Sequence, residues 1–432
     1  MKKITTVFLC FFITLFGILN KAEANPVQID IFGPSQFVVN IAMAEYQGSA
    51  PAAANVEKYI KENLSFLPFV KLVDPASILG GTKLDAINGP TLDYKRFQLA
   101  GADMLITAGW FKKGGERPYV ELRTFEVMTG KLIFGNAYYD VEPSKAGEIA
   151  DRFCSDLMKA MTGRGEFFRS TLAFAKSRDK KNKDIWAVRP TGRDLRQLSK
   201  LPGLAMSPSW SPDGRYVVFT HIDDRTHALG VWDKKTRQVQ RIKFPGNTVI
   251  GPAFLPDNRV AVSLSMGRNP SIYLLSHLFK KETLLEDSHF IDVSPSFDAT
   301  GKIMAYCSSR LGSPQIFVKN LGGGGSKRVS TGGYNTDPSI SPDGTLVAYA
   351  KMTDAGHRIF VYDMVTNTER QVSFGPGNDE EPSFAGDSYF LAFSSTRGGV
   401  KQIYLVTRQG GDVRKVPTGS GDASFPAWGL TD

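Results

Sequence analysis

Four polar side chains between residues 221 and 227 have the types and the spacing of metal ligands. They are His221, Asp223, Asp224 and His227. Imidazole and carboxylate groups bind zinc, which activates water for hydrolysis, so one hypothesis is a hydrolase or another metal-dependent enzyme that uses His221 and His227. The alternative, which we favour, is a polar turn between two strands.

The sequence lacks the motifs of common catalytic and nucleotide-binding sites. It contains no G-x-S-x-G nucleophile elbow and no G-x-G-x-x-G that opens a helix. Gly130-Lys131 and Gly301-Lys302 are each followed by an aliphatic residue instead of Ser or Thr. We therefore expect no enzyme activity, no cofactor and no bound metal.

The elements that position these residues follow a repeat. A proline followed two residues later by an aromatic or aliphatic residue returns at steps of 44, 43, 43, 44 and 44 residues. The anchor prolines are Pro208, Pro252, Pro295, Pro338, Pro382 and Pro426. A period of about 40 to 50 residues with several short strands in each unit predicts a β-propeller.

Each unit has the pattern of four strands. Proline opens the inner strand, where its missing N–H costs no ladder bond. Ser-Pro-Asp-Gly, intact at Ser211–Gly214 and Ser341–Gly344, suits the turn into a second strand. A third alternating strand and a short polar fourth strand follow.

The two ends of the repeat region complete each other. Residues 172–198 hold a second, third and fourth strand without an inner strand, whereas Phe425–Trp428 supplies an inner strand with nothing after it. We predict that the last segment completes the first blade, which gives a closed six-bladed propeller over residues 170–432 and hides its strand edges.

Residues 25–165 interleave helix and strand patterns and predict a small α/β domain. Helices are expected at Ala53–Leu67, Asp93–Ala100 and Pro143–Met161. Strands are expected at Val27–Phe32, Phe69–Val73 and Met104–Ala108, followed by a hairpin of Tyr119–Val127 and Lys131–Tyr139.

The first 24 residues have the organisation of a secretory signal peptide. Lys2 and Lys3 precede an apolar run from Ile4 to Leu19, and Ala22-Glu23-Ala24 provides a small-residue cleavage site after Ala24. The run is shorter than the roughly 18 residues of a spanning helix, and no later segment is apolar enough to span a membrane. An uncleaved membrane anchor is the alternative.

Charge and cysteine content set further expectations for the mature chain. Removing Lys2, Lys3, Lys21 and Glu23 lowers the formal charge from +9 to +7, and the basic residues are scattered, so we expect no nucleic acid partner. Cys154 and Cys307 lie in different predicted domains, and we expect two buried thiols.

Acidic residues gather directly before the anchor prolines. Because inner strands start at one mouth of a propeller channel, we expect these residues to make that mouth acidic. They are Asp292, Asp337, Asp379, Glu380 and Glu381. A cationic or hydrogen-bond-donating partner would relieve their repulsion, and ordinary solvated loops are the open alternative.

The chain resembles the TolB family of periplasmic proteins of the Tol-Pal envelope system. PSWSPDGRYVVFT at 208–220 and FPAWG at 425–429 are similar to its propeller repeats. Leu99–Asp103, Met161–Phe167 and Thr171–Phe174 are similar to its domain junction. The resemblance covers nearly all of the mature chain, and the chain departs from the family pattern at Ala150-Asp151 and over Gly33–Gly48.

The resemblance implies a non-catalytic periplasmic adaptor, expected as a monomer, that supports outer-membrane integrity and envelope constriction at cell division. Its implied partners are Pal, a peptidoglycan-associated lipoprotein, together with TolA and other outer-membrane proteins. Pal would dock at the propeller mouth, where the family's contacts carry over to Thr248, Gly251 and Val293. TolA would bind the mature N-terminal segment: Asn25, Pro26, Val27, Gln28, Ile29, Asp30, Ile31 and Phe32.

Overall fold

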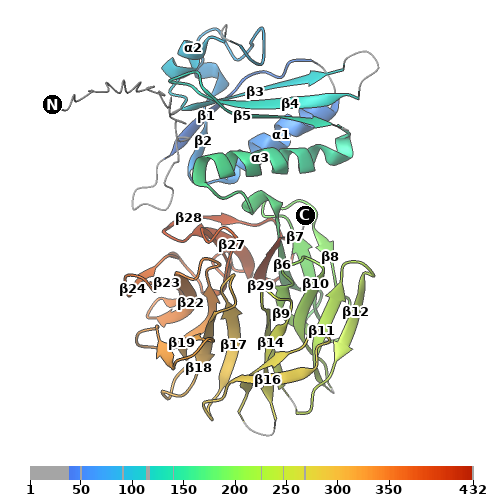
Figure 1. Cartoon of the computed structure of the whole chain (residues 1–432), viewed down its shortest axis with the longest axis vertical. Coiled ribbons are helices and arrows are strands. Elements are labelled where there is room, and N and C mark those ends of the chain that lie inside the picture. Colours follow the sequence, from blue (N-terminus) through green and yellow to red (C-terminus); the bar gives the residue numbers. More distant parts are fainter. Residues whose placement is uncertain are drawn as a thin grey trace, which may run out of the picture.

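The computed structural model describes residues 38–48, 51–89, 92–112, 117–139, 141–224, 226–246, 248–266 and 269–430. The expected signal peptide, its cleavage position at Ala24 and the segment Asn25–Phe32 lie outside these residues. Figure 1 shows a smaller α/β region stacked on one end of a ring of sheets. None of the helices in the described part of the chain combines the length and the apolar character that a membrane span requires.

The α/β region is built on a five-stranded mixed sheet in the order β2-β1-β3-β4-β5. β1 lies parallel to β2 and β3, whereas β4 and β5 continue the sheet as antiparallel neighbours. Helices α1 and α3 lie together on one face of the sheet (Figure 1). The bounds are β1 Val39–Met43, α1 Pro51–Phe66, β2 Val70–Leu72, η1 Pro75–Ser77, α2 Tyr94–Leu99, β3 Met104–Phe111, β4 Tyr119–Glu126, β5 Leu132–Tyr139, η2 Pro143–Lys145, α3 Ala146–Thr162 and η3 Phe167–Arg169.

The predicted helices and the hairpin are present, with ends shifted by a few residues. Sequence patterns missed β1, which occupies the interior of the sheet. Val39, Ile41 and Ala42 of this strand are all buried, so its side chains are covered on both faces. A strand flanked by parallel neighbours and covered on both faces lacks the alternation of polar and apolar residues that identifies a strand from sequence.

Twenty-four strands, β6 to β29, form the six blades of the predicted propeller. Blades 2 to 6 are the antiparallel meanders β9–β12, β13–β16, β17–β20, β21–β24 and β25–β28. One parallel residue pair, Lys183 with Leu204, joins blade 1 to blade 2. In blades 2 and 3 the strands are β9 Leu204–Trp210, β10 Tyr216–Ile222, β11 His227–Asp233, β12 Gln238–Ile242, β13 Thr248–Phe254, β14 Val260–Ser265, β15 Ser271–Leu275 and β16 Lys281–Glu286.

The later blades repeat this arrangement, and the C-terminal strand closes the ring in blade 1. The strands of blades 4 to 6 are β17 Asp292–Phe297, β18 Ile303–Ser308, β19 Gln315–Asn320, β20 Ser326–Arg328, β21 Asn335–Ile340, β22 Leu346–Thr353, β23 Gly356–Asp363, β24 Thr368–Gln371, β25 Asp379–Phe384, β26 Phe390–Ser395, β27 Gln402–Thr407 and β28 Gly410–Lys415. Blade 1 consists of β29 Ala423–Leu430, β6 Ser170–Ser177, β7 Lys183–Val188 and β8 Arg196–Gln197. β29 pairs with β6 from Ala423 opposite Lys176 to Leu430 opposite Ser170, so the predicted closure is confirmed.

The residue before each anchor proline adopts a left-handed backbone conformation. The inner strand shifts its register against the second strand at each of these places, which is the mark of a β-bulge. A non-glycine residue in this conformation costs about 1–2 kcal/mol. The six residues are Ser207, Gly251, Ser294, Asp337, Glu381 and Phe425, with φ between 49° and 58°.

Serine after the anchor proline ties neighbouring blades together. The Ser209 hydroxyl oxygen accepts the backbone N–H of Phe254 in the next blade at 3.1 Å. Ser296 accepts the N–H of Ile340, and Ser339 accepts the N–H of Phe384, each at 3.0 Å. These bonds explain why Pro-Ser-aromatic recurs: the serine holds the next inner strand in place, which offsets part of the strain at the bulge.

Aromatic side chains join the α/β region to the propeller. Phe167 of η3 packs on Phe390 with ring centroids 4.2 Å apart and lies 5.7 Å from the Trp428 ring. Phe69, which precedes β2, contacts Tyr389 with centroids 5.9 Å apart. One continuous buried cluster therefore spans both parts of the molecule.

A polar contact adds to this boundary at the position where the chain departs from the family pattern. Asp151 of α3 is almost completely buried and pairs with Arg193, which lies in the turn after β7. The Asn63 side chain of α1 donates to Asp151 at 2.9 Å, and the Arg193 guanidinium lies 4.9 Å from the Tyr59 ring centre. The carboxylate at 151 thus links α1 and α3 to the first blade.

Both cysteines beyond the expected signal peptide are free and buried, as predicted. Burial raises the pKa of the Cys154 thiol far above its ordinary value and that of the Cys307 thiol to about 12. Both sulfurs are therefore neutral thiols with the packing role of small apolar side chains.

Candidate functional site

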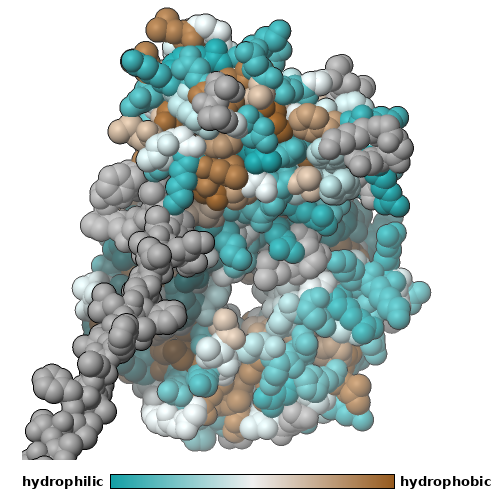
Figure 2. Space-filling view, turned by 45° about the horizontal axis from the view of Figure 1, so that its top comes forward, coloured by the Kyte–Doolittle hydropathy of each residue, from teal (hydrophilic) through white to brown (hydrophobic). Residues whose placement is uncertain are grey.

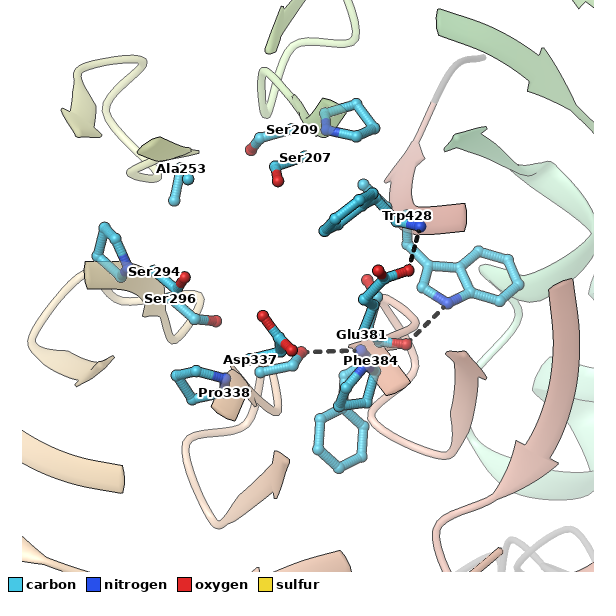
Figure 3. A pocket seen from close by; sticks show the side chains of 18 of the residues that line it. Ser207, Ser209, Ala253, Ser294, Ser296, Asp337, Pro338, Glu381, Phe384 and Trp428 are labelled. Atoms are coloured by element: carbon cyan, nitrogen blue, oxygen red, sulfur yellow. Dashed lines mark hydrogen bonds between the residues drawn. The ribbon is translucent and has the colours of Figure 1, made fainter. Parts of the chain in front are cut away.

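The channel of the propeller is a cavity of about 300 Å³ lined by the inner strands. Two rings of side chains surround it, one from the residue before each anchor proline and one from the residue after it. Figure 3 shows Asp337 and Glu381 pointing into this space opposite Ser207 and Ser294. The second ring is formed by Ser209, Ala253, Ser296, Ser339, Ser383 and Ala427.

The loops at one end of the channel form what we call the mouth face. It consists of the loops that lead into the inner strands and the loops that join second to third strands. The α/β region contacts the opposite end, where Phe390 follows the turn between the first and second strands of blade 6. Figure 1 places the α/β region above the ring, away from the mouth face.

Two of the predicted mouth acids are buried in ion pairs within their own blades. Asp292 is fully buried; one of its carboxylate oxygens accepts the Arg310 guanidinium at 3.2 Å and the other accepts the Ser288 N–H at 2.8 Å. Asp379 is also fully buried and binds Arg397 through both oxygens at 2.9 Å. These carboxylates hold the blades together and present no negative charge to a partner.

Glu380 and Glu381 share one cation. Lys401 lies 2.7 Å from a Glu380 oxygen and 3.2 Å from a Glu381 oxygen, and it is largely buried. His357 lies 3.2 Å from Glu380, and Glu381 accepts the backbone N–H of Phe425 at 2.7 Å. The expectation of an acidic mouth is therefore wrong for most of these acids, because basic side chains in the loops between the second and third strands pair with them.

Asp337 is the predicted mouth acid for which the described residues form no ion pair. It accepts the Thr336 hydroxyl at 2.9 Å and lines the channel beside Glu381. Burial, followed by the charge of Glu381, raises the pKa of its carboxyl to about 6. Negative charge at this end is thus confined to the channel itself.

The remaining predicted contacts lie at the start of two neighbouring blades. Thr248 is the first residue of β13, and Gly251 lines the channel against the backbone of Ser294. A side chain at 251 would meet the Ser294 Cα at 3.1 Å, so glycine lets these two strands lie close together without a shift. Val293 is half-buried and packs on the core cluster that contains Cys307. Their role in partner binding stays a prediction.

Sequence reasoning missed a set of exposed apolar side chains in the mouth-face loops of blades 4 to 6. The Ser309 N–H donates to the Ile291 carbonyl at 3.0 Å, and Leu311 lies two residues further along the same loop. Tyr334 and Met352 are adjacent, with the Met352 N–H donating to the Tyr334 carbonyl at 2.9 Å. Met352 is at the mouth-face end of β22, and the others lie in loops. The set is Phe290, Ile291, Leu311, Tyr334, Met352, Phe374 and Val400, each between 44% and 59% exposed.

Isolated apolar residues inside otherwise polar loops were the available signal for this set. Large exposed aromatic and aliphatic groups on one face indicate a protein contact surface when they gather. The surface in Figure 2, in which the mouth face is turned away, is mostly hydrophilic with small separate apolar groups. The exposed apolar side chains therefore make the mouth face the candidate partner surface.

The metal hypothesis does not fit the geometry of the β10–β11 hairpin. His227 stands opposite Ile222, so His221 on the adjacent position points to the other face of the sheet. His221 is buried with its Nε2 atom 2.8 Å from the Pro202 carbonyl, and burial lowers its pKa. The Asp223 carboxylate pairs with Arg241, and no group of three candidate ligands occurs among the described residues.

Comparisons with known proteins agree with this architecture. Residues 158–431 match the model of the TolB beta propeller domain. The chain is 64% identical over 300 residues to the Tol-Pal system protein TolB of Nitratidesulfovibrio vulgaris, a match that covers 68% of each chain. It is 31% identical over 281 residues to the Tol-Pal system protein TolB of Desulfosudis oleivorans, covering 63% of this chain and 61% of that protein.

A solved structure shows the same fold at low sequence identity. The crystal structure of TolB from Acinetobacter baumannii superposes with a TM-score of 0.78 at 17% identity, covering 90% of this chain and 96% of that chain. The match of the repeat region to the family model and the 64% identity to a curated relative agree with the arrangement of six blades and an α/β region. The chain belongs to the TolB family.

Proposed function

We propose that the chain is a non-catalytic periplasmic adaptor of the Tol-Pal system that binds a Pal-like lipoprotein through the mouth face. The observation that carries the proposal is the set of exposed apolar side chains in the mouth-face loops of blades 4 to 6. Family membership supports a role in the Tol-Pal system, and outer-membrane integrity and envelope constriction at cell division are the processes we assign to it.

The proposed contact is mainly apolar. Because Asp292, Asp379 and the two glutamates are paired within the propeller, a cationic partner would gain little from them. Aromatic side chains that insert into a partner contribute the largest share of binding energy at protein interfaces. Tyr334 and Phe374 are the exposed aromatic residues closest to the channel-lining Asp337 and Glu381 in sequence, and we assign them the central role.

Calorimetric titration of the mature chain with the soluble domain of Pal from the same organism tests this assignment. Phe374→Ala and Tyr334→Ala should each weaken binding by about 2 kcal/mol, roughly thirtyfold in Kd. Val365→Ala is the matched control, because Val365 is also exposed but lies in the turn between β23 and β24 at the other end of the blade. Equal affinity of all three variants would contradict the assignment.

We further propose that Asn25–Phe32 binds TolA after cleavage of the signal peptide at Ala24. The alternation of Val27, Ile29 and Ile31 supports a strand that pairs with a partner's sheet edge. Deletion of residues 25–32 should abolish TolA binding and leave the melting curve of the remaining chain unchanged. N-terminal sequencing of the exported protein tests the proposed cleavage after Ala24. The proposed domains of the mature chain are the α/β domain over 25–165 and the propeller over 170–432.

A further inference from the structure

The segment between α3 and β6 rests against a buried carboxyl group of blade 6. Asp387 lies in the turn between β25 and β26 and is 1% exposed. Its Oδ1 atom accepts the backbone N–H groups of Tyr389 and Phe390 at 2.8 and 3.1 Å. Its backbone carbonyl accepts the Arg164 guanidinium at 2.9 Å, so this turn binds the segment directly.

A second carboxyl group belongs to a side chain that lies against the same turn. The side chain of Glu166 lies against Gly386, with its Cβ 3.8 Å from the place where a Cβ of that glycine would be. The Oδ2 atom of Asp387 and the Oε2 atom of Glu166 are both buried, and neither has a hydrogen-bond partner. Buried carboxylate oxygens without a donor are costly, and a proton on one of the two groups supplies a donor.

The charged groups around the pair come from every element packed on it. Arg164 and Glu166 belong to the connecting segment, and Tyr389 is next to the turn. Asp343 of blade 5 lies 3.7 Å from Arg164 and 3.8 Å from Arg408. Arg164 thus donates to the Asp387 carbonyl and lies near Asp343, and its charge acts against the rise in the Asp387 pKa.

Aspartates at the same turn position of other blades behave in the opposite way. Burial and the charge of Glu166 raise the pKa of the Asp387 carboxyl to about 6, even though two backbone N–H groups and Arg164 act against the rise. Hydrogen bonds hold the pKa values of Asp257 and Asp343 below the ordinary range despite some desolvation. The difference follows first from burial, because Asp257 and Asp343 are exposed whereas Asp387 is buried. The charge of Glu166 adds to it, because among the described residues no other blade has an acidic side chain of the connecting segment against its turn.

We propose that the carboxyl groups of Asp387 and Glu166 form a proton-operated latch between the connecting segment and blade 6. With a proton bound, one carboxyl donates to the other and the segment stays packed on the turn. Without it, two negative charges face each other in a buried place, and the segment opens more often. The two parts of the molecule are then coupled more tightly in acid than at neutral pH.

The direction of the pH effect follows from proton linkage. Asp387 binds its proton more tightly in the closed state than in an open, solvated state, where an aspartate has a pKa near 4. Closing is therefore favoured below that ordinary value, and the advantage is lost as the pH rises through about 6. Between pH 5 and pH 8 the opening equilibrium should rise about tenfold.

Hydrogen exchange of the backbone amides of residues 164–170 in the full mature chain tests the proposal. After correction for intrinsic exchange rates, protection in the wild type should fall about tenfold from pH 5 to pH 8. Asp387→Asn keeps an acceptor for the two backbone N–H groups and adds a permanent donor toward Glu166. Its protection should be high and change less than about twofold over the same range.

Two further variants keep the test decisive. Glu166→Gln removes the negative charge beside Asp387 and should reduce the pH dependence of protection, which covers the case that Asp387→Asn does not fold. Asp257→Asn is the matched control, because Asp257 occupies the same turn position and accepts the Arg259 N–H at 3.0 Å. It should keep the wild-type pH dependence. An unchanged protection of the wild type between pH 5 and pH 8, or a wild-type pH dependence in both latch variants, would overturn the proposal.

Discussion

The two ends of the propeller are built from the same repeat but differ in the pairing of their acidic residues and in the exposure of their aromatic side chains. At the mouth face, buried acids such as Asp379 are paired with basic residues of their own blade, and aromatic side chains such as Phe374 are exposed. At the end that carries the α/β region, aromatic side chains are buried, and the acidic residue Glu166 packs against the turn that holds Asp387. One end therefore exposes apolar side chains to solvent, whereas the other buries them between two parts of one chain.

Truncating one aromatic residue at each end should give the largest difference. Phe167→Ala removes a buried ring that packs on Phe390 and Trp428, and it should lower the free energy of unfolding by about 3–5 kcal/mol. Phe374→Ala should change it by less than about 0.5 kcal/mol, because that side chain is 59% exposed. Urea denaturation of both variants measures the contrast, and similar losses would remove the distinction between the two ends.

Breaking a mouth-face ion pair should have the next largest effect. Arg397→Met leaves the fully buried Asp379 carboxylate without its cation and should cost about 3 kcal/mol. The double variant Arg397→Met with Asp379→Asn removes the buried charge as well and should recover most of that loss. Thermal and urea unfolding give both values. A loss below about 1 kcal/mol in the single variant would show that these acids are solvated after all.

Removing one link between blades should have the smallest effect. Ser339→Ala takes away the acceptor of the Phe384 N–H and should destabilise the propeller by about 1 kcal/mol. Ser420→Ala, at an exposed loop position, should stay within about 0.5 kcal/mol of the wild type. If the two variants unfold at the same urea concentration, the serine links do not offset the strain at the bulges.

The repeat made most of the propeller predictable. The spacing of the anchor prolines gave the number of blades, and the unmatched strands at 172–198 and 425–428 gave the closure by β29. These features depend on local turn residues and on the number of repeats, so they can be predicted without knowledge of tertiary contacts. The strand β1 was not predictable in this way, because an interior strand covered on both faces shows no alternation.

The charge of the mouth was misjudged because ion pairs across a blade are not visible in a local pattern. Asp292 and Asp379 were assigned to an acidic rim, although each pairs with an arginine in the loop that follows the second strand of its own blade. Arg310 and Arg397 each follow their aspartate by 18 residues. That repeated spacing was the signal available in the sequence. The opposition of Asp387 and Glu166 had no such signal, since it joins residues more than 200 positions apart.

The pairing of β29 with β6 also sets the order in which the molecule can be assembled. The paired residues Ser170 and Leu430 are separated by roughly 260 positions, and closing so long a loop costs on the order of 5 kcal/mol of chain entropy. Until the last strand arrives, β6 keeps an open edge that other chains can pair with. A ring held by its final strand therefore completes folding only after the whole chain has emerged, and shortened chains should aggregate instead of forming a smaller propeller.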